Sequence, residues 1–121
     1  MIAKVGKWIP FGKVNEISAE DLYQLISDRP NDVILIDVRT LMEWKLGHIK
    51  YARHIPILNF TQEIENLNLD KDKIMVPICL SAHRSIPAVR MLNENGYTNV
   101  KQLKGGMLAW NKHYKSALEK N

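Results

Sequence analysis

The segment Val33–Val38 limits the fold of this 121-residue chain more than any other feature. Apart from one aspartate it is valine, isoleucine and leucine, with no alternation between apolar and polar positions. Such a run is typical of a strand buried on both faces of a parallel sheet, because a solvated face would require a polar residue at every second position. A second run of this kind, Ile74–Ile78, predicts a second buried strand.

Segments with helical periodicity alternate with these strands. Ser18 is an N-cap residue, and the apolar residues Leu22, Leu25 and Ile26 follow it at helical spacing. Further helices are predicted at Thr40–Leu46, across Phe60–Leu67, at Ser85–Asn95 and after Gly105-Gly106, and further strands at Val14–Ile17, His54–Ile57 and Tyr97–Leu103. The alternation predicts an α/β fold: a doubly wound, mainly parallel sheet of about five strands with helices on both faces. We expect one domain over residues 14–118, preceded by an N-terminal extension over residues 1–13.

Pro77 conflicts with a strand in the middle of the sheet. Proline has no amide hydrogen to donate to the ladder, so it is rare in central strands. The sequence leaves two alternatives: the strand is bulged at Pro77, or the missing N–H would have faced no partner.

Composition and charge exclude several classes of function. The net charge is +4, from 17 basic and 13 acidic residues, and the lysines are spread over both ends of the chain. Nucleic-acid binding favours a clustered basic stripe, so we expect no nucleic acid as partner, although a mild positive field favours small anionic substrates. The longest charge-free stretch, Ile74–Ala82, is too short for a bilayer, and we expect no membrane contact. The start of the chain has no continuous apolar signal segment. One cysteine allows no internal disulfide, which fits a reducing, cytoplasmic location.

That cysteine, Cys79, directly follows the predicted strand Ile74–Ile78 and precedes a short polar loop and a helix. A thiol in this position faces unpaired backbone amides at a helix N-terminus, which favour thiolate over thiol. Two interpretations remain at this point. Cys79 is either a small buried apolar residue or a sulfur nucleophile held among anion-binding amides, and the nearby Arg84 favours the nucleophile.

Three ordered motifs support a resemblance that covers Glu16 to Tyr114. They are Ile36-Asp37-Val38-Arg39 with Glu43, Trp44, Gly47-His48-Ile49, Ala52 and Pro56; the loop Cys79–Ser85; and Gly96–Val100 with Leu103, Gly105-Gly106 and Trp110. In these motifs the chain resembles the single-domain rhodanese, or thiosulfate sulfurtransferase-like, family. The resemblance implies a rhodanese-like fold and sulfur transfer without cofactor or metal. A donor such as thiosulfate, or a persulfide, would pass its outer sulfur to Cys79, and a thiol, cyanide or a protein acceptor would remove it.

The resemblance also assigns roles to the residues of the site. Cys79 is the expected catalytic residue, and the substrate-binding residues are those of the loop: Leu80, Ser81, Ala82, His83, Arg84 and Ser85. We interpret Arg84 as the group that holds the donor's anionic end, with pairing to a carboxylate as the second interpretation. Ser85 is expected either to line the cradle around the sulfur or, by default, to cap the following helix. A structural ion-pair set behind the pocket is expected from Asp37, Arg39 and Glu43.

Two features of the loop refine this expectation. Four residues separate Cys79 from Arg84, whereas related phosphatases and arsenate reductases have five, so the shorter loop favours a sulfane sulfur over a phosphate. Ala82 stands where the family often has glycine; if this position has a positive φ, alanine is strained there by about 1 kcal/mol. Cys79, Asp37 and Arg39 each follow or end a predicted strand, so the pattern gathers them at the carboxyl edge of the sheet, where such folds bind ligands. The competing hypothesis is a non-catalytic or sulfur-carrier module that binds a protein through this edge.

Overall fold

The structure is a computed structural model that describes Ile9 and residues 12–120. Most of the predicted N-terminal extension, residues 1–13, therefore lies outside the described residues. Of that segment, the carbonyl oxygen of Ile9 accepts a hydrogen bond of 2.8 Å from Arg90.

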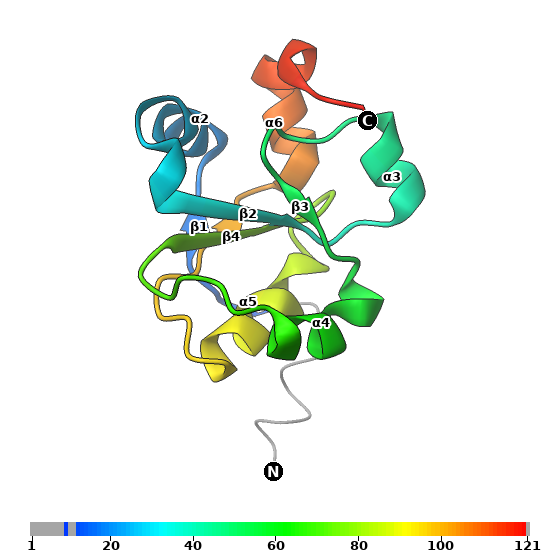
Figure 1. Cartoon of the computed structure of the whole chain (residues 1–121). Coiled ribbons are helices and arrows are strands. Elements are labelled where there is room, and N and C mark those ends of the chain that lie inside the picture. The colour runs from blue at the N-terminus through cyan, green and yellow to red at the C-terminus, as the bar shows by residue number, and fades with distance from the viewer. Residues whose placement is uncertain (1–8, 10–11, 121) are drawn as a thin grey trace.

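Parallel strands form the centre of the molecule (Figure 1). The strand order is β3 (Arg53–His54), β2 (Val33–Asp37), β4 (Ile74–Ile78), and a second pair, β5 (Gln102–Leu103) and β1 (Glu16–Ile17), is also parallel. A parallel bridge between Met75 and Val100 links β4 to the chain just before β5. The prediction of a mainly parallel α/β sheet of about five strands is confirmed.

Helices cover both faces of these strands, as predicted (Figure 1). The helices α4 (Phe60–Asn66) and α5 (Ser85–Glu94) lie on one face, and α2 (Ala19–Asp28), α3 (Leu41–Leu46) and α6 (Gly106–Tyr114) lie on the other. Short 3-10 turns occur at Pro30–Asp32, Ile57–Asn59 and Lys115–Ala117. Within the described part of the chain, no helix has the length and apolar character needed to cross a membrane.

Each face of the sheet has its own apolar core. Ile36 and Met75 belong to the core on the α4 and α5 side, which also contains Phe60 and Leu92. The neighbouring strand residues belong to the opposite core, which includes Leu35, Val76, Leu22, Met107 and Trp110. Adjacent residues of β2 and β4 thus enter different cores, which is why these strands are apolar at nearly every position.

Local sequence signals set the ends of several helices. The Ser18 hydroxyl accepts a hydrogen bond from the Asp21 amide at the start of α2. Thr40 and Glu43 form a reciprocal capping box at the start of α3, and Gly96 has a φ of 91° just after α5. These ends agree with the sequence prediction because a cap depends on residues within one turn of the helix.

The last predicted strand is shorter than expected, and Pro77 gives the physical reason. The strand predicted over Tyr97–Leu103 is reduced to the Val100 bridge and β5. The amide of Met75 donates to the Asn99 carbonyl at 2.9 Å, so the nitrogen of Pro77, two residues on, faces the same side. With no hydrogen there, the ladder cannot continue towards β5. Of the two alternatives, the bulge is not observed, because Pro77 remains in β4 in continuous register, paired with Ile36 of β2.

Candidate active site

Cys79 is the first residue after β4, at the carboxyl edge of the sheet. Its exposed fraction is 1%, and its side chain belongs to the core on the α5 side. Its carbonyl oxygen accepts a hydrogen bond of 2.8 Å from the Met107 amide at the start of α6. Strand β2 ends beside it, because β2 pairs with β4 and the Val38 amide donates to the Ile78 carbonyl at 2.9 Å. The fold thus brings together the two strand ends that the sequence predicted to meet.

The backbone of residues 80–84 lies between Cys79 and α5. Among the described residues, the amides of residues 80–84 donate no backbone hydrogen bond. Unpaired amides at the start of a ten-residue helix favour negative charge nearby, through both their hydrogen atoms and the helix dipole. The arrangement can hold a sulfur anion at Cys79.

Ser85 differs from its predicted role as a helix cap. The N-cap position of α5 is Arg84, with no side-chain cap, and Ser85 is the first residue of the helix. The Ser85 hydroxyl instead lies 3.4 Å from the Cys79 sulfur and donates to Oε1 of Gln102 at 2.6 Å. The hydroxyl is therefore part of the surroundings of the thiol, because burial leaves it no water and these two groups are its partners.

Sequence reasoning missed Gln102. It is a buried glutamine on β5, and its Nε2 group donates to the Glu16 carboxylate at 2.9 Å. The register of β1 against β5 pairs these two residues directly. Nothing in the sequence distinguished Gln102, because the predicted strand over residues 97–103 also contains Thr98, Asn99 and Lys101, and nothing local indicated its partners.

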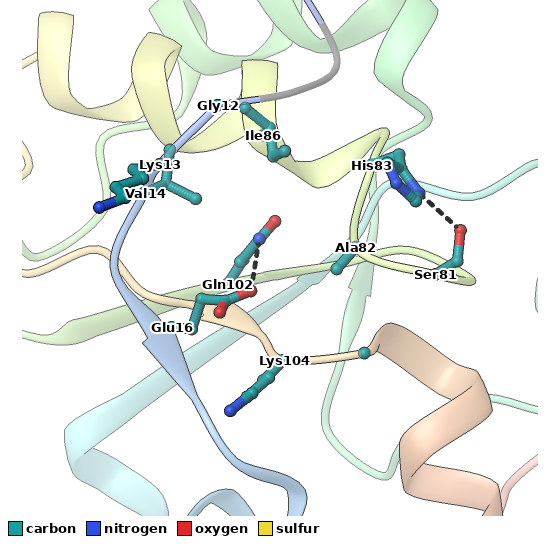
Figure 2. Close-up of a pocket in the computed structure, with 11 residues that line it drawn as sticks. Gly12, Lys13, Val14, Glu16, Ser81, Ala82, His83, Ile86, Gln102 and Lys104 are labelled. Carbon is teal, nitrogen blue, oxygen red and sulfur yellow. Dashed lines mark hydrogen bonds between the residues drawn. The ribbon is translucent and has the colours of Figure 1, made fainter.

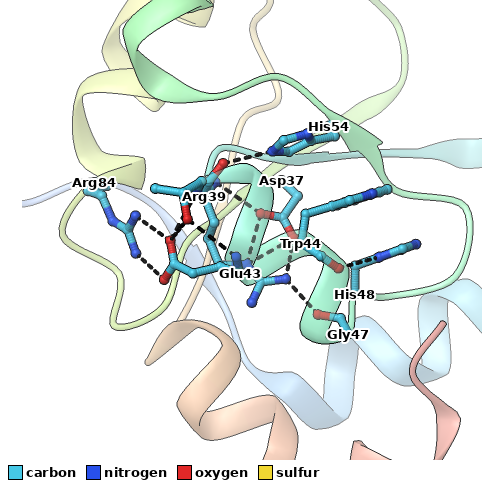
Figure 3. A network of polar contacts seen from close by, with 9 residues as sticks. Asp37, Arg39, Glu43, Trp44, Gly47, His48, His54 and Arg84 are labelled. Atoms are coloured by element: carbon cyan, nitrogen blue, oxygen red, sulfur yellow. Dashed lines mark hydrogen bonds and ion pairs between the residues drawn. The ribbon is translucent and has the colours of Figure 1, made fainter. Parts of the chain in front are cut away.

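Asp37 and Arg39 form a buried ion pair, as the sequence predicted. Nε and Nη2 of Arg39 donate to the Asp37 carboxylate at 2.8–3.1 Å, and Nη2 also donates to the Gly47 carbonyl at 2.8 Å (Figure 3). The carbonyl of Arg39 contacts Nε2 of His54 at 2.8 Å. The pair ties the end of β2 to the end of α3, and the backbone of Arg39 contacts β3 at His54, so the role of the pair is structural.

Glu43 does not join that pair, which corrects the predicted set of three. Its carboxylate accepts from Nη1 and Nη2 of Arg84 at 2.7 and 2.8 Å, a two-bond contact between α3 and the active-site loop (Figure 3). It also accepts from the amide and hydroxyl of Thr40, each at 3.0 Å. The structure therefore shows Arg84 in the second of its two interpretations, paired with a carboxylate. Its contact with a donor stays a prediction.

The contact between Glu43 and Arg84 shifts the pKa values of both side chains. The hydrogen bond from Arg84 lowers the pKa of Glu43 from 4.5 to about 2, against partial burial, with further lowering by Thr40. The same hydrogen bond raises the pKa of Arg84 above its usual value, and the charges of Glu43, Cys79 and Asp37 act in the same direction. Arg84 is thus held as a cation within the electrostatic range of Cys79.

We expect this pair to make the domain acid-sensitive. Because the folded-state pKa of Glu43 is depressed, its stabilisation is complete above pH 4.5 and disappears as the pH falls towards about 2. Denaturant unfolding measures how far the free energy of unfolding falls between pH 4.5 and about 2. This fall should be about 1–2 kcal/mol smaller in Glu43→Gln than in the parent, a value reduced for the partial exposure of the pair. The control is Glu63→Gln, an exposed acid on α4. Equal acid sensitivity of parent and Glu43→Gln would contradict the pairing.

The histidines and tryptophans near the site make ring contacts and hydrogen bonds within the fold. The ring of buried His48 stacks on Trp44 at 3.4 Å, and its Nδ1 contacts the Trp44 carbonyl at 2.9 Å. Trp110 is buried in the core beneath α6. His83 is exposed on the loop, where its Nδ1 contacts the Ser81 hydroxyl at 3.0 Å (Figure 2). No group of three or more potential metal ligands occurs among the described residues.

Ala82 has a φ of 69°, so the loop position that the sequence singled out does have the left-handed backbone. We expect Ala82→Gly to raise the free energy of unfolding by up to about 1 kcal/mol, because glycine adopts this backbone without the strain of a Cβ. Chemical denaturation tests this. The matched control is Ala88→Gly in α5, where glycine should destabilise by a similar amount. Equal destabilisation by both changes would show that Ala82 is not strained.

A cavity of about 500 Å³ lies against the loop. Its walls come from three parts of the chain, and its lining includes Lys13, Glu16, Ala82, His83, Gln102 and Lys104 (Figure 2). Residues 12–14 form one wall, so the described end of the predicted extension borders the loop. The cavity therefore places loop residues, the Gln102 side chain and several cationic groups around one space.

Comparisons with known proteins agree with this geometry. The family model described as rhodanese-like domain matches residues 18–113. A sulfurtransferase of Allochromatium vinosum is 38% identical over 100 residues, which cover 83% of this chain and 91% of that protein. A tRNA uridine(34) hydroxylase of Bdellovibrio bacteriovorus is 33% identical over 108 residues, 87% of this chain but 31% of that protein. A rhodanese-like domain protein from Staphylococcus aureus has a similar crystal structure, with a TM-score of 0.76, 27% identity, and coverage of 89% of this chain and 99% of that one. The chain belongs to the rhodanese-like domain family.

Proposed function

We propose that the protein is a sulfurtransferase that carries a sulfane sulfur on Cys79. The Cys79 thiolate attacks the outer sulfur of thiosulfate, or the terminal sulfur of a persulfide donor. A sulfur–sulfur bond forms at Cys79, and the donor's own sulfur–sulfur bond breaks, so that sulfite or the donor thiolate leaves with the electron pair. A thiolate or cyanide acceptor then attacks the bound sulfur, and Cys79 leaves as the thiolate. The two steps balance without a cofactor.

The observation that carries the proposal is the place of Cys79 beneath the loop. Cys79 follows the end of a central strand and directly precedes residues 80–84, whose amides donate no backbone hydrogen bond among the described residues. A persulfide anion requires such donors, because burial separates it from water. The matched relatives that are named sulfurtransferases support the same chemistry.

The cavity supports an anionic donor. Lys13 and Lys104 are among its lining residues, and its carboxylate, Glu16, is hydrogen-bonded to Gln102. Positive groups around a concave space raise the local concentration of small anions. We therefore place thiosulfate or an anionic persulfide in this cavity. The short loop from Cys79 to Arg84 favours these donors over phosphate esters.

The second candidate is a non-catalytic or sulfur-carrier module that binds a protein. The Glu43–Arg84 contact favours it, because the guanidinium that would hold a small donor already has a carboxylate partner. The similarity to part of a tRNA uridine(34) hydroxylase also shows that such domains occur within larger proteins. In this candidate a partner protein supplies or accepts the sulfur at the same edge, within the reducing cytoplasm that the single cysteine suggests.

Intact mass spectrometry after incubation with thiosulfate, and separately with glutathione persulfide, tests the proposal. We expect the mass of one sulfur atom to be gained and then lost when cyanide or a thiol is added. Gain from the persulfide but not from thiosulfate would favour the carrier candidate. No gain from either donor would contradict sulfur transfer in both forms.

A further inference from the structure

We propose that Gln102, oriented by Glu16, is a positioning residue that sets the direction of the hydrogen bond between Ser85 and Cys79. Its effect is to favour the thiol form of Cys79 before a donor binds. The inference deepens the proposed function, on which it rests for Cys79 being the reacting group. Its basis is a continuous chain of polar contacts from the buried sulfur to the cavity.

The chain has three links. The Cys79 sulfur lies 3.4 Å from the Ser85 hydroxyl, which lies 2.6 Å from Oε1 of Gln102. Nε2 of Gln102 lies 2.9 Å from the Glu16 carboxylate, and Figure 2 shows this last link at the wall of the cavity. Gln102 is 3% exposed, whereas Glu16 is exposed. This series of polar contacts therefore begins in the core, at Cys79, and ends at the cavity, at Glu16.

The chemistry of Glu16 fixes the direction of every link. An ionised carboxylate only accepts hydrogen bonds, so Gln102 turns its NH₂ group towards Glu16 and its oxygen towards Ser85. Ser85 has one hydroxyl hydrogen and donates it to that oxygen. A lone pair of the Ser85 oxygen therefore faces Cys79. The sulfur can satisfy this contact only as a thiol that donates its hydrogen.

Ionisation of Cys79 disturbs this arrangement. As a thiolate, the sulfur faces a lone pair of the Ser85 oxygen. Alternatively, the Ser85 hydroxyl rotates to donate to the sulfur, and Oε1 of Gln102 is left without a partner. A buried acceptor without a partner costs free energy, so both outcomes oppose the thiolate. The amide of Gln102 is not basic and passes no proton to Glu16, so the thiol proton leaves to solvent instead. Gln102 acts by orientation and not as a proton relay.

Other charged groups around the site act on Cys79 at the same time. The elements packed around it contribute Asp37 and Arg39 from the end of β2, Glu43 from α3, His83 and Arg84 from the loop, and Glu16 from β1. Arg84 and the loop amides favour the thiolate, whereas the Ser85–Gln102–Glu16 chain opposes it. Of these influences, only the Ser85–Gln102–Glu16 series of hydrogen bonds depends on the side chain of Gln102. A mutation of Gln102 therefore separates the contribution of this series from the others.

Titration of the thiolate by its ultraviolet absorbance tests the inference without requiring sulfur transfer. Each protein is compared with its own Cys79→Ser counterpart, so that the difference signal belongs to Cys79. In Gln102→Leu, Ser85 loses its acceptor and can donate to the sulfur. We expect the midpoint of the Cys79 titration to move to lower pH. At a pH below the midpoint, the thiolate fraction should rise roughly three- to tenfold, which corresponds to the contribution of one hydrogen bond.

Two further comparisons separate orientation from general disturbance. In a Ser85→Ala background, Gln102→Leu should no longer move the midpoint, because its effect passes through the hydroxyl. Glu16→Gln, an exposed change, should give a smaller shift in the same direction, and Glu20→Gln on α2 controls for the lost charge. An equal shift with and without Ser85, or no shift in Glu16→Gln beyond that of Glu20→Gln, would overturn the inference. The Glu16 comparison decides the matter if Gln102→Leu fails to fold.

Discussion

Replacement of Cys79 by serine should abolish the gain of sulfur from every donor while the domain remains folded. A serine hydroxyl has almost the size of the thiol and fits the same buried position, but it is ionised only at far higher pH and forms no persulfide. Intact mass after incubation with thiosulfate should show the parent with one added sulfur and the variant with none. The rate of thiocyanate formation from cyanide should fall to the background of the reagents.

Two control measurements check that Cys79→Ser is folded. Circular dichroism and the denaturant midpoint should stay close to those of the parent, with a loss of about 1 kcal/mol for the added buried hydroxyl. Sulfur transfer to cyanide at the parent rate in folded Cys79→Ser would show that another group carries the chemistry. That result would remove the central assignment of the proposed function.

Gly106→Ala should have the largest effect on stability. Gly106 has a φ of 60°, and a Cβ there would lie 2.5 Å from the backbone oxygen of Cys79 and 2.5 Å from the carbonyl carbon of Leu80. Backbone atoms cannot move aside as a side-chain end can. We expect a loss of about 2–5 kcal/mol in the free energy of unfolding, from overpacking together with the left-handed backbone.

The same change should also impair the site. The start of α6 holds the loop through hydrogen bonds from Met107 to the Cys79 carbonyl at 2.8 Å and from Leu108 to the Leu80 carbonyl at 3.0 Å. Displacement of α6 would break these contacts and move the loop, so the rate of sulfur transfer should fall even at temperatures where the variant is folded. Denaturant unfolding and the cyanide assay measure the two effects separately.

Gly96→Ala is the matched control for Gly106→Ala. Gly96 has a φ of 91°, but a Cβ there would first meet the flexible end of Lys71, 3.3 Å away. Its substitution should cost about 1 kcal/mol from backbone strain alone and leave sulfur transfer unchanged. Similar losses of stability in the two variants would show that the contact between α6 and the loop is not tight.

Much of the fold could be predicted because its signals are local. The strands at Val33 and Ile74 were identified within one residue of their ends, since unbroken apolar runs suit a sheet covered on both faces. The cap at Ser18 was also predicted, because it acts within one helical turn, whereas Thr40, expected inside its helix, is the N-cap one residue before it. The last strand was predicted too long, because its ladder depends on Pro77, which lies in a different strand.

The site was predictable in part for the same reason. The place of Cys79 follows from a strand, a loop and a helix in direct succession, and the positive φ of Ala82 agrees with a loop position that the family often fills with glycine. The grouping of Glu43 with Asp37 and Arg39 was wrong, and so was the default role of Ser85 as a helix cap. A short side chain at a helix start caps the helix by default, and only the neighbours in space showed another contact.

The sequence by itself determined the class of fold and the position of Cys79 at the carboxyl edge of the sheet. Each of these follows from periodicity and from residues adjacent in the chain. The tertiary structure alone decided that Arg84 pairs with Glu43, 41 residues away, and that Gln102 joins Ser85 to Glu16, 86 residues before it. Such contacts depend on strand register and on the way helices pack across the sheet, and a side chain's hydrogen-bond partners are fixed only when those distant segments meet.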